Sequence, residues 1–350
     1  RSDLFWFGGS QVDPKRVLVF FDNVRIPELR KPVPDSVLNE IEKQGMSWVW
    51  LGSGQMERKH APVWVPHSTN DSLLAQLKRR QPKPGGPSEA WVARESARIV
   101  RQVDYWLAFY RSFNVKVHLE FETGHDRVLA QNIALDLAGG VRMGWQHSEL
   151  LTGEGHALGY RPHHVHFAWN ARGSSGAENG RNRIESAIVS GFPYDGTWRF
   201  DTGPRQLRER LTANGARFLV ALFDNAIFTD DIFSKSMIQA LYTAFLQWVL
   251  EDAQIGVANK SKRASILEQL PEIHGLMAEA EATGRWVNLT HVHSPEPSDA
   301  FRAADMSVGI GIASTVVETA AAGGRGIHCD LPAMRDHPFY EWGYEKVVFD

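Results

Sequence analysis

Short apolar runs, rich in β-branched and aromatic residues, alternate along this chain with longer segments in which apolar residues recur every three or four positions. The short runs predict strands, and the longer segments predict helices that cross over between parallel strands. The chain should therefore form an α/β structure with mostly parallel sheets. The expected strands span 17–21, 48–52, 115–121, 141–146, 163–169, 187–192, 218–223, 253–259, 286–290, 306–311, 325–330 and 346–350.

Twelve strands are too many for one typical nucleotide-binding sheet, and they divide well into two. Segment 195–216 is polar, contains Asp-Thr-Gly-Pro and predicts a break before the next strand. We therefore place a domain boundary near residue 200, with an N-terminal domain at 1–200 and a C-terminal domain at 201–350. The expected helices span 93–113, 127–138, 235–251, 263–283 and 315–322.

The charge balance and the cysteine content exclude some classes of function and of binding site. The 38 basic and 41 acidic residues give a net charge of −3, so the chain lacks the basic excess of a nucleic-acid-binding protein, and we expect no nucleic-acid partner. The single cysteine, Cys329, excludes an intramolecular disulfide and a cysteine-based zinc site.

The sequence also bears on location. It contains no targeting signal and no run near the roughly 20 apolar residues of a membrane span, so we expect a cytoplasmic protein. The chain begins with Arg1 rather than Met and stops at Asp350, directly after an expected strand. We therefore expect an excerpt of a longer protein whose C-terminal domain is cut short.

The most informative stretch is 304–330, which predicts a strand, a glycine-rich turn, a short helix, a glycine break and another strand. Such a unit brings backbone N–H groups and the positive end of a helix dipole to the carboxyl edge of a sheet, where an anion binds. Glu318 lies one turn into the helix, where its carboxylate can accept both hydroxyls of a ribose. The alternative is that Ser314 or Thr315 is only a helix cap and Glu318 its capping partner.

The run Asp305-Met-Ser-Val-Gly-Ile-Gly311, followed by Ser314-Thr315-Val-Val-Glu318-Thr-Ala-Ala-Ala-Gly323, resembles the donor-binding motif of the GT-B glycosyltransferase superfamily. The resemblance implies two Rossmann-like domains with mostly parallel sheets that face a cleft, the second domain binding a nucleotide-sugar donor. It also implies that Glu318 holds the ribose and that the turn from Gly311 to Ser314 and Thr315 faces the phosphates.

Two lysines support this resemblance. Lys260 and Lys262 follow the expected strand at 253–259, at a position similar to that of the basic residue that GT-B enzymes place against the donor diphosphate. Ammonium groups there would neutralise the departing nucleotide in place of a metal ion. A solvated basic loop is the alternative.

The first half is similar to bacterial surface-carbohydrate transferases, in which an aliphatic helix leads to a strand ending in Gln-His-Gly. Here the strand ends in Gln146-His147-Ser148, and segments 163–172 and 187–195 resemble later parts of the same group. The resemblance covers roughly residues 115 to 350. It implies transfer of a hexosyl or CMP-sugar-type donor to a glycan or lipid-linked glycan acceptor in surface or capsular polysaccharide biosynthesis. The nucleotide sugar is then a substrate, and no cofactor is expected.

The same resemblance places the reaction at the inner face of the cytoplasmic membrane. The resemblance also leaves open a further partner, a membrane-associated assembly complex that the protein would contact through flanking regions.

Candidate catalytic residues lie at strand ends of the first half. His147 ends a strand, where an imidazole can act as a base or contact a phosphate; a histidine hydrogen-bonded between the domains is the alternative. Glu120, Glu122, His125 and Asp126 cluster after the strand at 115–121. Of these, Glu122 and Asp126 are candidates for the acceptor's base, with solvated loop charge as the alternative.

A metal site is less well supported. His163, His164 and His166 lie close in sequence, but no third ligand is identifiable beside the pair that shares a strand face, and packed strand histidines are the alternative. The Asp-x-Asp pair of metal-dependent transferases is absent from the sequence. We therefore expect metal-independent catalysis.

Two other functions remain open. A non-hydrolysing sugar-nucleotide epimerase shares the architecture and would turn over a sugar nucleotide without an acceptor. A catalytically silent carbohydrate-binding or scaffold domain would bind a donor without transfer.

Overall fold

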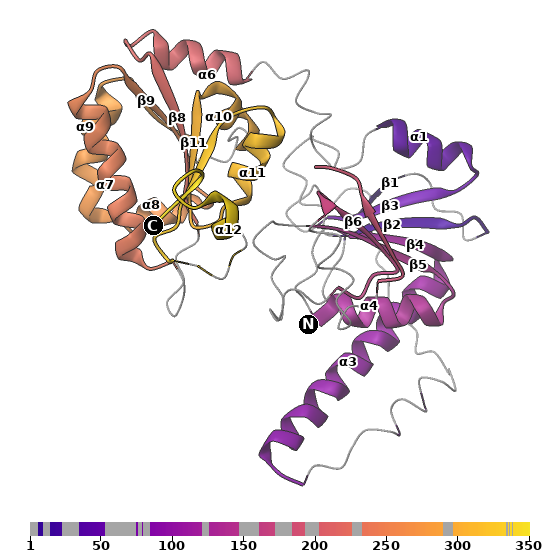
Figure 1. Ribbon diagram of the computed structural model, residues 1–350. Helices are drawn as coiled ribbons and strands as arrows, with labels where there is room; N and C mark the ends of the chain where they lie inside the picture. Colours follow the sequence, from indigo (N-terminus) through magenta and orange to yellow (C-terminus); the bar gives the residue numbers. More distant parts are fainter. Residues whose placement is uncertain are drawn as a thin grey trace. The chain divides into compact units, whose positions relative to one another are not determined.

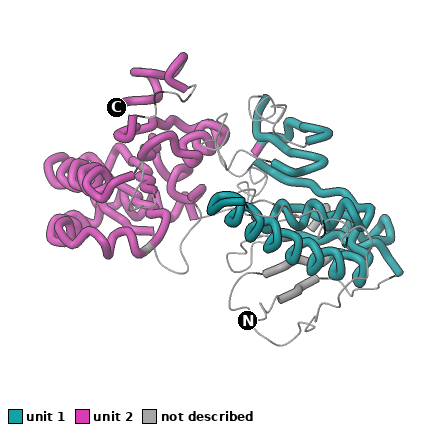
Figure 2. Tube along the Cα trace, turned by 90° about the horizontal axis from the view of Figure 1, so that it is seen from below, with its two compact units in different colours: residues 1–147, 151–191 teal, residues 148–150, 192–350 magenta. Residues whose placement is uncertain are grey.

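The computed structural model describes two compact units, residues 1–147 with 151–191 and residues 192–350 with 148–150 (Figure 2). The described residues are 6–9, 15–22, 35–52, 75, 79, 85–120, 126–146, 161–171, 184–192, 203–225, 233–289, 297–333, 335, 337 and 339–350.

Unit 1 is built on a seven-stranded sheet in the order β1-β3-β2-β4-β5-β6-β7, in which only β1 is antiparallel to its neighbour. Its strands are β1 (Trp6–Gly9), β2 (Leu18–Asp22), β3 (Ser47–Gly52), β4 (Val115–Glu120), β5 (Val141–Trp145), β6 (Val165–Ala168) and β7 (Ser186–Val189). Its helices are α1 (Asp35–Lys43), α3 (Pro87–Ser112) and α4 (Asp126–Leu137).

Helices cover both faces of this sheet (Figure 1). Leu18 and Phe20 of β2 pack against α3 and α4, and Val19 and Phe21 point to the opposite face, where Leu38 of α1 lies. Successive residues of a strand point to opposite faces, so a continuous apolar run such as β2 requires a cover on each.

Unit 2 has a six-stranded, wholly parallel sheet in the order β10-β9-β8-β11-β12-β13. Its strands are β8 (Phe218–Phe223), β9 (Ile255–Lys260), β10 (Trp286–Asn288), β11 (Met306–Ile310), β12 (Gly326–Cys329) and β13 (Val348–Phe349). Its helices are α6 (Gly203–Thr212), α7 (Lys235–Glu251), α8 (Ala264–Glu268), η4 (Pro271–Ile273), α9 (His274–Ala282), α10 (Pro297–Ala303), α11 (Ser314–Ala321) and α12 (Phe339–Gly343).

The core of unit 2 has the same two-sided design. Val220 and Leu222 of β8 belong to the cluster formed with α7 and α9, whereas Leu219, Ala221 and Phe223 belong to the cluster formed with α6 and α10. Figure 1 shows α7 and α9 on one face of the sheet and α6 and α10 on the other. No helix in the described part of the chain combines the length and the apolar character that a bilayer crossing requires.

Each of the twelve expected strands is present, within a few residues of its expected ends, and β1 is an additional strand that the pattern did not predict. The expected helix at 235–251 coincides with α7, and those at 93–113, 127–138 and 315–322 correspond to α3, α4 and α11.

Two expectations were wrong. Segment 195–216 contains helix α6, which buries only Leu207 and Leu211 beside its N-terminal Pro204 and so gives too sparse an apolar pattern. The single helix expected at 263–283 is divided into α8, η4 and α9. Pro271 lies at the division, and proline lacks the N–H that would continue a helix.

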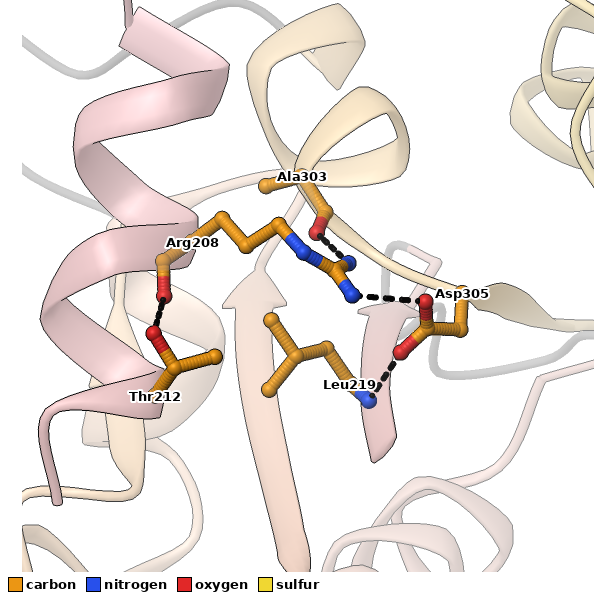
Figure 3. Close-up of polar contacts among 5 residues, drawn as sticks. All are labelled: Arg208, Thr212, Leu219, Ala303 and Asp305. Carbon is orange, nitrogen blue, oxygen red and sulfur yellow. Dashed lines mark hydrogen bonds and ion pairs between the residues drawn. The ribbon is translucent and has the colours of Figure 1, made fainter. Parts of the chain in front are cut away.

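Asp305 joins three elements of unit 2 at the amino end of β11 (Figure 3). Its Oδ2 accepts a 2.8 Å hydrogen bond from the Leu219 backbone N–H, and its Oδ1 accepts a 2.9 Å bond from Arg208 of α6. Arg208 also donates to the Ala303 carbonyl at the end of α10, at 2.9 Å. Asp305, the first residue of the donor-like motif, is therefore structural and lies away from the carboxyl edge.

We expect Asp305→Ala to lower the free energy of unfolding by about 1–3 kcal/mol, because the buried Leu219 N–H loses its side-chain acceptor. Arg208→Met is the matched control. It removes a half-exposed ion pair and should cost about 1 kcal/mol or less. Urea unfolding followed by circular dichroism measures both, and equal losses in the two variants would contradict this account.

Candidate functional site

The strand order of unit 2 indicates where on its sheet a ligand would bind. The chain builds β9 and β10 on one side of β8, and β11, β12 and β13 on the other. The loops after β8 and β11 therefore leave neighbouring strands in opposite directions, which is the arrangement beside which open α/β sheets bind ligands. The loop after β9 lies at the same edge, because all six strands are parallel.

The turn after β11 is held by a histidine of β12. Gly311 has a φ of +66°, a conformation that glycine adopts readily, and its N–H donates to the Cys329 carbonyl at 2.7 Å. Nδ1 of the buried His328 accepts the Ala313 N–H at 3.0 Å. The imidazole thus holds the end of the turn from which helix α11 begins.

Helix α11 begins at this turn without a side-chain cap. Its N-cap is Ala313, so Ser314 and Thr315 lie inside the first turn. The capping-box alternative is therefore wrong. A first turn without a capping side chain retains N–H groups that attract an anion. Gly309 allows the helix to approach this closely, because a Cβ there would lie 2.6 Å from that of Ala313.

The polar residues of α11 lie where the motif predicts. Ser314 and Glu318 are half-buried and one helical turn apart, so they share one side of the helix. The buried hydroxyl oxygen of Thr315 has no hydrogen-bond partner among the described residues. The arrangement can place an anion at the turn and a hydroxyl-bearing group beside Glu318.

Lys260 and Lys262 lie at the same edge, at the end of β9, which is separated from β11 by β8. Lys260 is the last residue of β9, the neighbour of β8. The ammonium group of the exposed Lys262 donates to Oδ1 of Asn225 at 2.7 Å, and its backbone N–H donates to Oδ1 of Asp224 at 2.6 Å. The structure thus brings both lysines and the glycine turn to one sheet edge.

Asp224 and its partner Tyr242 were not among the residues that the sequence singled out. Asp224 directly follows β8, and this position at a strand end was the one available signal. Burial raises the pKa of the Asp224 carboxyl, while hydrogen bonds from Ser261, the Lys262 backbone and Tyr242 oppose that rise. Tyr242 lies within α7, where a buried aromatic residue gives no functional signal.

The expected catalytic residues of unit 1 stay predictions. His147 and Glu122 lie outside the described residues, as does the side chain of Asp126, whose backbone begins α4. Glu120 ends β4 and is fully buried, where it forms an ion pair with Arg142 of β5. That pairing makes Glu120 a structural residue.

Two of the histidines around β6, His164 and His166, have polar protein partners, whereas both ring nitrogens of the buried His163 have none among the described residues. His164 contacts Asp136 through Nε2 at 2.7 Å and accepts the Arg142 N–H at Nδ1 at 3.0 Å. Nε2 of His166 lies 3.1 Å from Arg161. A methyl group at Gly144 would overlap the ring of His163, so that ring packs against the strand. The described residues contain no group of three or more ligands suited to a metal ion.

Comparison with known proteins identifies the fold. No protein-family model and no curated protein matches the sequence. Among solved structures, MnaA of S. aureus in complex with UDP is similar over 90% of this chain and 79% of its own, with a TM-score of 0.52 and 8% identity. The chain has the GT-B fold.

Two further solved structures cover similar shares of the chain. MurG of Acinetobacter baumannii is 12% identical over 92% of this chain and 81% of its own, with a TM-score of 0.46. A glycosyltransferase of Rickettsia africae is 8% identical over 90% and 79%, also with a TM-score of 0.46.

The buried histidines should make the GT-B fold of this chain sensitive to acid. Burial lowers the pKa of His328 to about 4 and that of His166 to about 3. An unfolded histidine titrates near 6.5, so unfolding takes up protons as the pH falls below that value. The free energy of unfolding should fall by about 1.4 kcal/mol per pH unit for each such histidine, down to the folded pKa.

His328→Asn tests this contribution, because the asparagine oxygen can accept the Ala313 N–H but does not titrate. Between pH 6 and pH 4.5, urea unfolding of the variant should show a slope smaller by about 1.4 kcal/mol per pH unit than that of the wild type. Equal slopes would mean that His328 is not the neutral acceptor described.

Proposed function

We propose that this chain is a glycosyltransferase whose unit 2 binds the nucleotide-sugar donor at the carboxyl edge of its sheet. One observation carries the proposal. Helix α11 begins without a side-chain cap at a turn fixed by His328, and Glu318 follows one turn later, beside the point where the strand order reverses. The UDP in the similar S. aureus MnaA structure supports a nucleotide as the ligand.

In this proposal the donor phosphates bind at the N-terminus of α11 and the ribose hydroxyls donate to Glu318. When the bond from the anomeric carbon to the phosphate oxygen breaks, the electron pair and its negative charge pass to the leaving nucleotide. The first-turn N–H groups and the ammonium groups of Lys260 and Lys262 stabilise that charge.

The acceptor's hydroxyl oxygen forms the new bond to the anomeric carbon and gives up its proton. His147, Glu122 and Asp126 are the proposed candidates for the base that takes this proton. We further propose that the acceptor is a glycan or lipid-linked glycan of bacterial surface polysaccharide biosynthesis, and that transfer proceeds without a metal ion or cofactor. The resemblance of segment 127–148 supports the choice of acceptor.

Thermal stability in the presence of UDP, CMP, GDP, CDP and their sugar conjugates tests donor binding. Nucleotides that carry one particular nucleobase should stabilise the protein, by about 2.7 kcal/mol at 100 times the dissociation constant. Glu318→Ala should abolish most of this stabilisation. Glu251→Ala, which changes an exposed glutamate at the end of α7, is the matched control and should retain it.

A response that is equal in wild type and Glu318→Ala would remove Glu318 from the site. No response to any nucleotide would contradict the proposed function, whereas stabilisation by a sugar nucleotide without transfer to any acceptor would favour the silent domain. Incubation of the stabilising sugar nucleotide without acceptor separates the remaining alternative, because conversion to an isomeric sugar nucleotide would identify an epimerase.

A further inference from the structure

The buried carboxylate of Asp224 contacts the turn that carries the two lysines of the proposed donor site. Asp224 is 9% exposed, and both of its oxygens accept hydrogen bonds. Oδ2 accepts from the hydroxyls of Tyr242 at 2.7 Å and Ser261 at 2.6 Å, and Oδ1 accepts the Lys262 N–H at 2.6 Å. Asp224 thereby joins the end of β8, helix α7 and the turn after β9.

The connection continues through the carboxyl ends of two more strands. The Tyr242 hydroxyl also lies 3.2 Å from Oδ1 of Asn259 in β9, and Nδ2 of Asn259 donates to Oδ1 of Asn288 in β10 at 2.7 Å. Asn288 in turn donates to Glu281 of α9 at 2.6 Å. Asp224, Tyr242 and Asn259 are the buried members of this network, and they are held in one geometry because each would lose a partner if it moved.

A negative charge is unexpected beside a site for phosphate. Both Asp224 oxygens are occupied by donors from the protein, which favours a positioning role over proton transfer to or from a substrate. The bond to the Lys262 N–H fixes the backbone of the turn, and the neighbouring Asn225 contacts the Lys262 ammonium group at 2.7 Å. The carboxylate therefore controls where the lysines leave the sheet.

We propose that Asp224 is a positioning residue for phosphate binding: through Ser261 and the Lys262 backbone it holds the turn after β9 so that Lys260 and Lys262 stay at the carboxyl edge. This inference rests on the proposed function. In this role the Asp224 carboxylate fixes the positions of the two ammonium groups and does not itself contact the donor.

Isothermal titration with inorganic pyrophosphate, and with the nucleotide that stabilises the wild type, tests the proposal. Asp224→Asn keeps the size of the side chain but removes its charge and one acceptor. It should weaken both ligands about tenfold, the equivalent of one charge-assisted hydrogen bond. Ser261→Ala, a milder change, should weaken them in the same direction.

Asp252→Asn is the matched control. Asp252 also accepts a backbone N–H, from Gln254 at 2.8 Å, but it precedes β9 and so lies at the amino edge of the sheet. Its replacement should leave both affinities unchanged. Circular dichroism and urea unfolding establish that each variant is folded before it is titrated.

A double-mutant cycle separates positioning from a general loss of structure. If Asp224 acts through the lysines, Asp224→Asn should have no further effect on binding in a chain that already carries Lys260→Ala and Lys262→Ala. Tenfold weakening in that background as well would overturn the positioning role while leaving the proposed function intact. Absence of binding by the wild type would instead overturn both.

Discussion

Parallel strand pairing is the constraint on which the rest of this structure depends. Six strands that run in one direction must all end at the same edge, and each strand must return through a crossover that covers a face of the sheet. Both faces of β8 are consequently filled by helices, and its residues from Leu219 to Phe223 are buried. Polar chemistry in unit 2 is thereby concentrated at the strand ends and in the turns that follow them.

Buried polar groups then fix these turns. At the amino edge Asp305 joins α6 to β8, and at the carboxyl edge His328 and Asp224 hold the turns after β11 and β9. Each of these side chains accepts one backbone N–H, from Leu219, Ala313 and Lys262 respectively, so that these three donors have partners. Such hydrogen bonds stabilise the fold at the amino edge. At the carboxyl edge they give the N–H groups and ammonium groups a defined arrangement.

Local patterns explain how much of this could be predicted. The strands were predictable because their apolar runs are short, β-branched and bounded by polar turns, and the motif at 304–330 located the glycine turn and α11. Helix α6 was missed because only Leu207 and Leu211 mark its buried side. The partners of the site were missed for another reason: Tyr242 and Ser261 lie 18 and 37 residues from Asp224, and single-sequence patterns do not encode such pairs.

Hydrogen–deuterium exchange with and without a saturating nucleotide tests the central claim most directly, because it reports where on the chain the ligand binds. A donor bound at these two turns should slow the exchange of backbone amides at 311–316 and 260–263, with little change around Leu219 and Asp305 at the amino edge. Slower exchange confined to unit 1, or to the amino edge of unit 2, would contradict a donor site formed by these two turns.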